Sequence, residues 1–336
     1  CDANAFTPGQ LGGFLQAMQL PVFGGVFPGI YHERESLVRG SLVVGFSCHI
    51  EVAIVDVLAS LDDEVARCTP QPLPPRLRDT QILFVDAFTP RIDSFIDTLF
   101  DHQGLVFKQI GAGAGSLSFV QKPCIISNRG LLQDVAVLAR LSLESRLGMA
   151  HGWQIISESI KVTGSRKNEI THLDHRPAAE VYGEIVARHG GRAPDRDDFF
   201  AVAKAYPFGV CKLGSEVVVR DPLGLTPSGG ITCPGQVAVG TFLHVLHGQP
   251  DDVIGAAARA AGIAQADGGK AQLRLFFNCL SRSLFLEARQ MEELDAVQGP
   301  ETLIGVHAVG EICNMGADYP EFHNKTAVLG LLGGGA

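Results

Sequence analysis

The stretch LIGVHAVGEICNMGADYPEFHNKTAVLGLL, residues 303–332, decides how we interpret the fold. It predicts a buried strand, a Gly-Glu-Ile turn, a polar excursion that ends in His-Asn-Lys-Thr, and a second buried strand. Residues 21–46 and 106–141 follow the same plan, because small residues end one apolar run and a second apolar run follows. Glycine at a strand exit permits positive φ angles and close backbone approach. We therefore predict three internally repeated strand–Gly turn–strand units, each returning to its own sheet.

The rest of the chain alternates between strand-like and helix-like segments. Residues 81–87 predict a buried strand, residues 92–100 a helix with helical spacing of apolar residues, and residues 105–110 the next strand. This alternation predicts an α/β fold of mixed β-sheets flanked by helices. The run ARHGGRAPDRDDFF, residues 187–200, is rich in Gly, Pro and charge, which is typical of a connection between domains. We therefore divide the chain into domains 1–195 and 196–333.

Composition narrows the functional classes. The 336 residues are 46% hydrophobic and 19% charged with a net charge of −9, which indicates a globular protein and argues against nucleic-acid binding. No apolar run reaches the roughly 18 residues of a membrane-spanning helix. Eight cysteines without a C-x-x-C pair favour reduced thiols in a cytoplasmic protein and no metal site. Because Cys1 leads directly toward a helix, we expect a strand upstream of it rather than a lipoprotein tether.

Several longer motifs resemble FIST domains, sensory modules made of an N-terminal and a C-terminal part. The resemblance rests on the runs GEI and EFHNKTAVLGLL near the C-terminus and on others in chain order: GAGAGSLSFVQKPCIISNRGLLQDVAVLARL, LGMAHGWQIISESIKVTGSRKNEI, LDHRPAAEVY, VVVRDPLGL, GTFLHVLHGQPDDVIGAA and FFNCLSRSLFLE. It implies a small-ligand sensor or adaptor module and does not name the ligand. The sequence carries no transmitter helix, kinase motif or DNA-binding motif, so we expect output through a separate signalling partner such as a kinase or cyclase. Eukaryotic relatives imply an alternative, an adaptor of a ubiquitin ligase.

Polar residues at predicted strand ends form the candidate ligand site. Cys279 and Arg282 lie at a strand-to-helix junction, where first-turn amides and a guanidinium suit an anion or carboxylate. Glu311 follows one buried strand, and His323 and Asn324 precede the next, so these groups suit the amine and carboxylate of an amino-acid-like ligand. The same three residues would equally tie the excursion loop across its base. All five match positions of the family's motifs, although Ser281 stands where relatives often carry Gly.

Arg282 is expected to face Glu311 or a ligand anion, because a buried guanidinium needs a fixed partner. Cys279 also supports a rival interpretation, in which a thiolate activated by the helix end and Arg282 acts with Glu311 in acyl or amide chemistry. A buried core cysteine explains the same residue, and no histidine base is assigned to it. We expect a binding module rather than an enzyme.

Two cofactor signals are weighed as well. The GAGAG run at residues 111–115 lacks the Rossmann spacing and continues as strand-like sequence, so it predicts a tight turn and no nicotinamide site. Some FIST proteins imply a second possibility, a nitric-oxide sensor with haem b. Its axial ligand would be His151, beside the only tryptophan, Trp153, with His49 and His323 as weaker choices. A histidine that merely orders a turn explains His151 equally, and we expect no bound cofactor.

Overall fold

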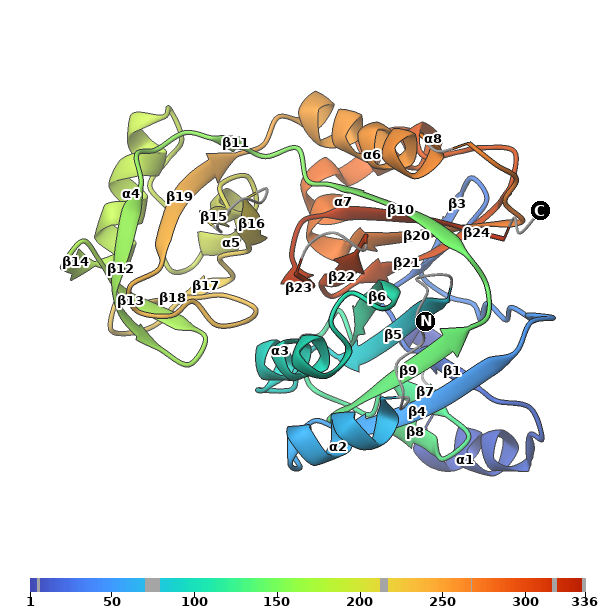
Figure 1. The fold of residues 1–336 in the computed structure, drawn as a ribbon. Coiled ribbons are helices and arrows are strands. Elements are labelled where there is room, and N and C mark those ends of the chain that lie inside the picture. The colour runs from blue at the N-terminus through green and yellow to red at the C-terminus, as the bar shows by residue number, and fades with distance from the viewer. Residues whose placement is uncertain (5–6, 70–78, 212–216, 267, 316–318, 334–336) are drawn as a thin grey trace.

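The protein is described here by a computed structural model that covers residues 1–4, 7–69, 79–211, 217–266, 268–315 and 319–333. The chain forms a large lobe of two six-stranded sheets covered by helices, and a smaller lobe to one side (Figure 1). This arrangement confirms the predicted α/β class with mixed sheets. Among the described residues, no helix combines the length and apolar character needed to cross a bilayer.

The first sheet of the large lobe has the order β23-β22-β6-β5-β9-β4. Its strands β5 and β6 are parallel and are joined by helix α3. Ile92, Phe95, Ile96 and Leu99 of α3 are buried, and this spacing gives the helix one apolar stripe that packs on the sheet. The bounds are β4 Ile50–Asp56, β5 Thr80–Asp86, β6 Lys108–Ala114, β9 Val135–Leu141, β22 Glu311–Asn314, β23 Glu321–His323, α2 Leu61–Cys68 and α3 Ile92–Gln103.

The second sheet has the order β10-β24-β20-β21-β2-β3, and it repeats the parallel pair of the first sheet in β20 and β21. Helices α6, α7 and α8 cover its outer side (Figure 1). The bounds are β2 Ile30–His32, β3 Glu35–Leu37, β10 Ser145–Ala150, β20 Leu273–Cys279, β21 Thr302–Ala308, β24 Ala327–Leu332, α6 Pro250–Gln265, α7 Leu280–Leu286, η2 Glu287–Arg289 and α8 Gln290–Ala296.

The two sheets share one hydrophobic core and exchange strands. The core unites residues of the first sheet, such as Ile82 and Val137, with residues of the second, such as Phe277 and Val328. The C-terminal hairpin β22–β23 completes the first sheet, and the N-terminal hairpin β2–β3 completes the second. The N-terminal and C-terminal parts of the chain therefore complete each other's sheets.

The predicted repeat differs from the observed sheets. In residues 21–46, β1 (Phe23–Gly25) and β2 enter different sheets, and residues 40–46 form no strand, so that unit is wrong. In the other two units the strands do return to one sheet, but β6 and β9 flank β5, and β21 and β24 flank β20. In each case the strand in the middle comes from an earlier part of the chain, which a pattern of successive apolar runs does not reveal.

The glycines of residues 111–115 are also placed differently from the prediction. Most of this run lies inside β6 rather than in a tight turn. A Cβ on Gly111 would lie 2.2 Å from the Leu83 carbonyl oxygen, and a Cβ on Gly113 would lie 2.2 Å from the Val309 carbonyl oxygen. The glycines are therefore needed for close strand approach.

The smaller lobe consists of a twisted antiparallel sheet with helices α4 and α5, and it has its own hydrophobic core. That core includes Ile160, Tyr182, Phe208 and Val245, so it draws on both sides of residue 195. The predicted division at residue 195 thus does not coincide with the division between cores. The bounds are β11 Gln154–Ile155, β12 Ile160–Arg166, β13 Glu169–Leu173, β14 Arg176–Pro177, β15 Phe208–Val210, β16 Val218–Arg220, β17 Gly224–Leu225, β18 Ile231–Thr232, β19 Phe242–His247, α4 Ala178–Arg188 and α5 Phe199–Ala203.

A small third sheet of the large lobe flanks the first six-stranded sheet. It contains β1, β7 (Ile125–Ser127) and β8 (Gly130–Leu132), and helix α1 (Pro8–Ala17) packs against β8. A short turn of 3-10 helix, Asp2–Asn4, precedes α1. This sheet and helix α2 stand on either side of the edge strand β4.

Candidate functional site

A cavity of about 480 Å³ lies between the two lobes. The large lobe contributes residues that follow the carboxyl ends of its parallel strands, including Thr89 after β5, Cys279 at the end of β20 and Val309 after β21. The smaller lobe contributes Lys167 and Asp221. In α/β sheets, ligands commonly bind just outside the carboxyl ends of parallel strands, so the location is typical of a binding site.

The cavity wall combines apolar and polar surface. Phe88, Phe119 and Leu280 give it an apolar part. Thr89 is only 4% exposed, and its hydroxyl finds no hydrogen-bond partner among the described residues. A buried hydroxyl without a partner costs about 1–3 kcal/mol, so a hydrogen bond to the Thr89 hydroxyl would stabilise the protein.

Two of the five predicted ligand-binding residues, Cys279 and Asn324, line this cavity. Glu311 and His323 pair with each other across β22 and β23 and are buried. Glu311 contacts the Cys279 thiol and accepts a hydrogen bond from the Thr326 amide at 3.3 Å. The structure thus brings Glu311 together with His323 and Cys279, but Glu311 and His323 are not among the residues that line the cavity.

Burial governs the chemistry of Cys279 and Glu311. Burial raises the pKa of the Glu311 carboxyl well above its ordinary value, which favours the neutral acid. Burial and the neighbouring Glu311 raise the pKa of the Cys279 thiol above its usual range as well. Because the thiolate is the nucleophilic form, this environment suits a buried thiol rather than an activated one.

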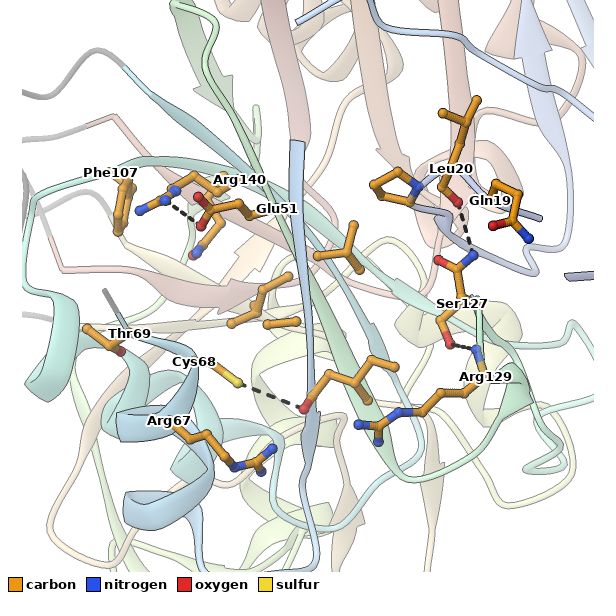
Figure 2. Close-up of a pocket in the computed structure, with 17 residues that line it drawn as sticks. Gln19, Leu20, Glu51, Arg67, Cys68, Thr69, Phe107, Ser127, Arg129 and Arg140 are labelled. Atoms are coloured by element: carbon orange, nitrogen blue, oxygen red, sulfur yellow. Dashed lines mark hydrogen bonds and ion pairs between the residues drawn. The ribbon is translucent and has the colours of Figure 1, made fainter. Parts of the chain in front are cut away.

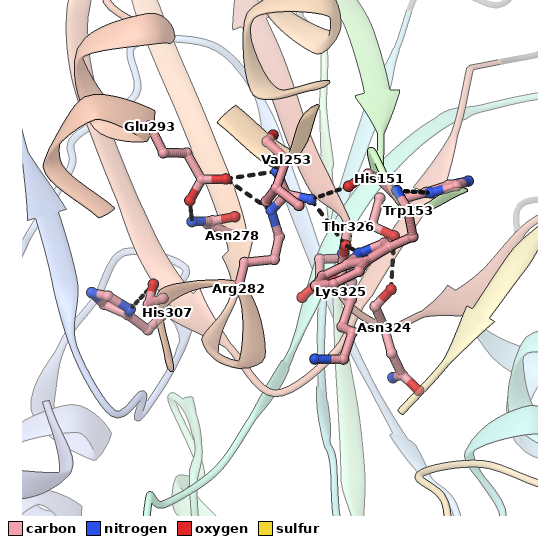
Figure 3. Close-up of polar contacts among 12 residues, drawn as sticks. His151, Trp153, Val253, Asn278, Arg282, Glu293, His307, Asn324, Lys325 and Thr326 are labelled. Carbon is pink, nitrogen blue, oxygen red and sulfur yellow. Dashed lines mark hydrogen bonds and ion pairs between the residues drawn. The ribbon is translucent and has the colours of Figure 1, made fainter. Parts of the chain in front are cut away.

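Arg282 lies elsewhere than predicted. Its guanidinium is fully buried and forms an ion pair with Glu293 of α8, with Nη2 2.6 Å from Oε1, and not with Glu311. Nη1 donates to the carbonyl oxygens of His151 at 2.6 Å and Lys325 at 3.0 Å, and Nη2 also donates to Val253 at 2.8 Å. With Nε donating to Glu293, these bonds use all five N–H groups. Arg282 therefore ties elements of the large lobe together (Figure 3). The polar residues at the predicted strand ends did not indicate its acidic partner, because Glu293 lies on helix α8.

Lys325 is a buried residue at the centre of the His-Asn-Lys-Thr turn that the site prediction omitted. Its φ angle is +52°, and its ammonium lies 4.8 Å from the Trp153 ring centre and 3.3 Å from Asp221 Oδ1. Nζ also donates to the Lys204 carbonyl at 2.9 Å. A buried charge requires such partners, so the turn is held by both lobes.

Arg220 and Asp221, also absent from the prediction, carry the contact from the smaller lobe. Arg220 Nη1 donates to the Phe322 carbonyl at 2.6 Å, and the Asp221 amide donates to Asn324 Oδ1 at 3.4 Å. Burial raises the pKa of Asp221, whereas Lys325 and the Ser281 hydroxyl oppose the rise. Neither carboxylate oxygen of Asp221 accepts a hydrogen bond of ordinary geometry from the described residues. In the sequence, these residues were signalled only by a polar Arg-Asp pair at the end of the apolar run Val217-Val218-Val219.

The histidine proposed for haem occupies a tight turn. His151 Nδ1 accepts a hydrogen bond from the Trp153 amide at 3.0 Å, and burial lowers the pKa of His151 to about 4, which keeps the ring neutral. A neutral ring that accepts at Nδ1 carries its proton on Nε2, so it has no lone pair left for iron. The Trp153 indole in turn donates to the Lys325 carbonyl at 3.0 Å (Figure 3). These residues do not fit an axial haem site as they stand.

The two weaker candidates for the axial haem ligand, His49 and His323, lie in different environments. His49 is exposed and lies 3.3 Å from Glu51 Oε1, whereas His323 is buried within the turn. Across the described ranges, no group of three histidine, cysteine or acidic side chains has a geometry that could hold a metal ion.

Comparison with known families agrees with this architecture. The FIST N domain model matches residues 8–176, and the FIST C domain model matches residues 178–314. Together they span most of the chain, which therefore belongs to the FIST family, a class of domains associated with sensory signal transduction. No curated protein matches the chain.

Proposed function

We propose that the protein is a sensory module that binds a small polar ligand of the amino-acid type in the inter-lobe cavity and signals through a separate partner protein. The observation that carries this proposal is a cavity of about 480 Å³ between the two lobes, whose wall includes Thr89, a residue whose hydroxyl has no hydrogen-bond partner in the described part of the chain. The volume is within the range of about 300–1,000 Å³ typical of small-molecule sites.

The charges of the cavity fit a zwitterion. Asp221, which also pairs with Lys325, and the adjacent Asn324 give one part of the wall a carboxyl group and an amide, so this end suits an ammonium group. Lys167 is exposed at the cavity's margin and suits a carboxylate. The apolar surface of Phe88, Phe119 and Leu280 would then cover an aliphatic or aromatic side chain.

A signal would follow from the position of the cavity. Its wall includes Asp221 of the smaller lobe and Asn324 of the turn, and these residues also form contacts that join the lobes. A ligand that binds more tightly to one relative arrangement of the lobes shifts the population toward it. The partner, such as a kinase or cyclase, would read that arrangement.

The enzyme alternative has less support. Its nucleophile would be Cys279 and its acid or base Glu311, but burial raises the pKa of both groups, so a thiolate is disfavoured at neutral pH. Binding without turnover is therefore the function that the geometry favours.

The test uses Thr89→Val, which removes the hydroxyl and nearly preserves the shape. The free protein should become more stable, or stay unchanged, because an unsatisfied buried hydroxyl is lost. Isothermal titration of the twenty amino acids, guided by a thermal-shift screen, should find one that binds the wild type and binds the variant about five- to tenfold more weakly. Thr98→Val, on the exposed side of α3, is the matched control. Absence of binding by any of these compounds, or equal affinity in the two proteins, would refute the proposal.

A further inference from the structure

A second, separate groove of about 730 Å³ lies along the edge strand β4 of the first sheet. Arg67 and Cys68 at the end of α2 stand on one side of it, and Leu20 and Arg129 stand on the other (Figure 2). Among the residues that the structure describes, β4 pairs only with β9, so its second edge faces this groove. An open strand edge in a groove is where an extended peptide can add a strand.

The hydrogen bonds fix which residues of β4 point outward. The His49 carbonyl accepts a hydrogen bond from the Ser142 amide, and the Val57 amide donates to the Asp134 carbonyl. The backbone amides and carbonyls of odd-numbered residues in β4 therefore point toward β9. The Ile54 carbonyl accepts a hydrogen bond from the Cys68 thiol at 3.9 Å, and the Asp56 amide donates to the Glu64 carboxylate at 3.1 Å. The backbone amides and carbonyls of even-numbered residues therefore point toward the groove.

Helix α2 therefore covers only the second half of the open edge. In the first half, the amide and carbonyl of Val52 point outward by the same alternation, and no described residue forms a hydrogen bond with them. An added strand would pair with Val52 first, and its neighbours would extend the ladder.

The charge of the groove selects the partner. Three arginines and one glutamate line it, within a chain of net charge −9. Arg140 pairs with Glu51 and Arg67 with Glu64, whereas Arg129 is exposed and makes no ion pair within the described part of the chain. Arg129 therefore lacks an ion-pair partner among the described residues, so charge complementarity favours an acidic partner.

We propose that this groove docks an extended acidic segment of a partner protein, which pairs antiparallel or parallel with the Val52 edge. Adjacent residues of a strand point to opposite faces, so two consecutive acidic residues would reach the two walls, one toward Arg67 and one toward Arg129. The partner is thus recognised by main-chain pairing and by a pair of neighbouring carboxylates. The site does not involve the inter-lobe cavity, so it stands or falls independently of the proposed ligand.

The experiment uses the peptide fluorescein-Thr-Val-Glu-Glu-Val-Thr-amide, labelled at its N-terminus, and measures its fluorescence anisotropy with the full chain. We expect saturable binding that weakens as the salt concentration rises. A peptide in which both glutamates are replaced by glutamine should bind at least about tenfold more weakly. Val52→Pro removes the outward amide at a position where an edge strand tolerates proline, and should weaken binding about tenfold. Val52→Thr retains the amide and is the matched control.

Arg129→Glu keeps the test valid if the proline variant fails to fold, because this side chain is exposed. It should weaken binding of the Glu-Glu peptide, whereas Arg166→Glu on the smaller lobe should not. Equal binding by Arg129→Glu and wild type would overturn the proposal, as would equal binding by a folded Val52→Pro variant. A dimer in sedimentation that is lost in Val52→Pro would also overturn it, because the edge would then serve a second copy.

Discussion

The sharpest consequence of the site geometry concerns Arg282, which we expect to stabilise the protein rather than to hold a ligand. Replacing it with Met keeps the apolar length of the side chain and removes all five hydrogen bonds. The Lys325 carbonyl would still accept from Trp153, and the Glu293 carboxylate would still accept from Asn278 at 2.6 Å. The largest cost is therefore the charge of Glu293, left without its cation in a fully buried place.

Removing one partner of a buried ion pair costs about 3–5 kcal/mol, and this is the loss of unfolding free energy that we expect for Arg282→Met. Urea unfolding followed by the fluorescence of Trp153 measures it directly, because this single tryptophan packs against Lys325, whose carbonyl Arg282 binds. The double variant Arg282→Met, Glu293→Leu removes both charges and should recover most of the loss.

Arg140→Met is the matched control, because its ion pair with Glu51 is at the surface and should contribute about 0–1 kcal/mol. Two results would refute the reasoning. One is a loss for Arg282→Met no greater than that of the control. The other is a folded Arg282→Met variant that has normal stability but has lost ligand binding, since that would return Arg282 to the ligand site.

Three further predictions follow from the buried groups. Purified protein should show no Soret band on addition of hemin; a band that His151→Ala abolishes would establish the haem alternative and contradict the hydrogen bond assigned to His151 Nδ1. Cys279 should react with iodoacetamide far more slowly than the exposed Cys211, as read by peptide mass spectrometry, because burial raises the pKa of the Cys279 thiol; preferential labelling of Cys279 would instead support the enzyme. Burial lowers the folded-state pKa of His307 to about 4, below its unfolded value, so this residue contributes stability above about pH 6.5 that is lost as the pH falls toward 4. His307→Gln should show a smaller loss of unfolding free energy between pH 6.5 and pH 5 than the wild type, and an unchanged slope would count against the neutral buried ring.

The sequence alone determined part of the local structure, and the family. Apolar spacing over residues 92–100 predicted most of α3, and the apolar run 81–87 predicted β5, since both signals are confined to neighbouring residues. The order of motifs also identified the FIST resemblance, which the family models confirm. The concentration of polar residues between β22 and β24 indicated where a buried polar cluster would form.

Only the tertiary structure decided which of those polar groups meet and which face a cavity. Arg282 pairs with Glu293, and Lys325 with Asp221, a residue about a hundred positions earlier in the chain and in the other lobe. Glycine is likewise needed in β6 because the carbonyl oxygens of Leu83 and Val309 lie too close to leave room for a Cβ atom. Hydrophobic periodicity records whether a side chain is buried but not what it is buried against. Partners brought together by strand exchange and by docking of the lobes are therefore invisible until the chain is folded.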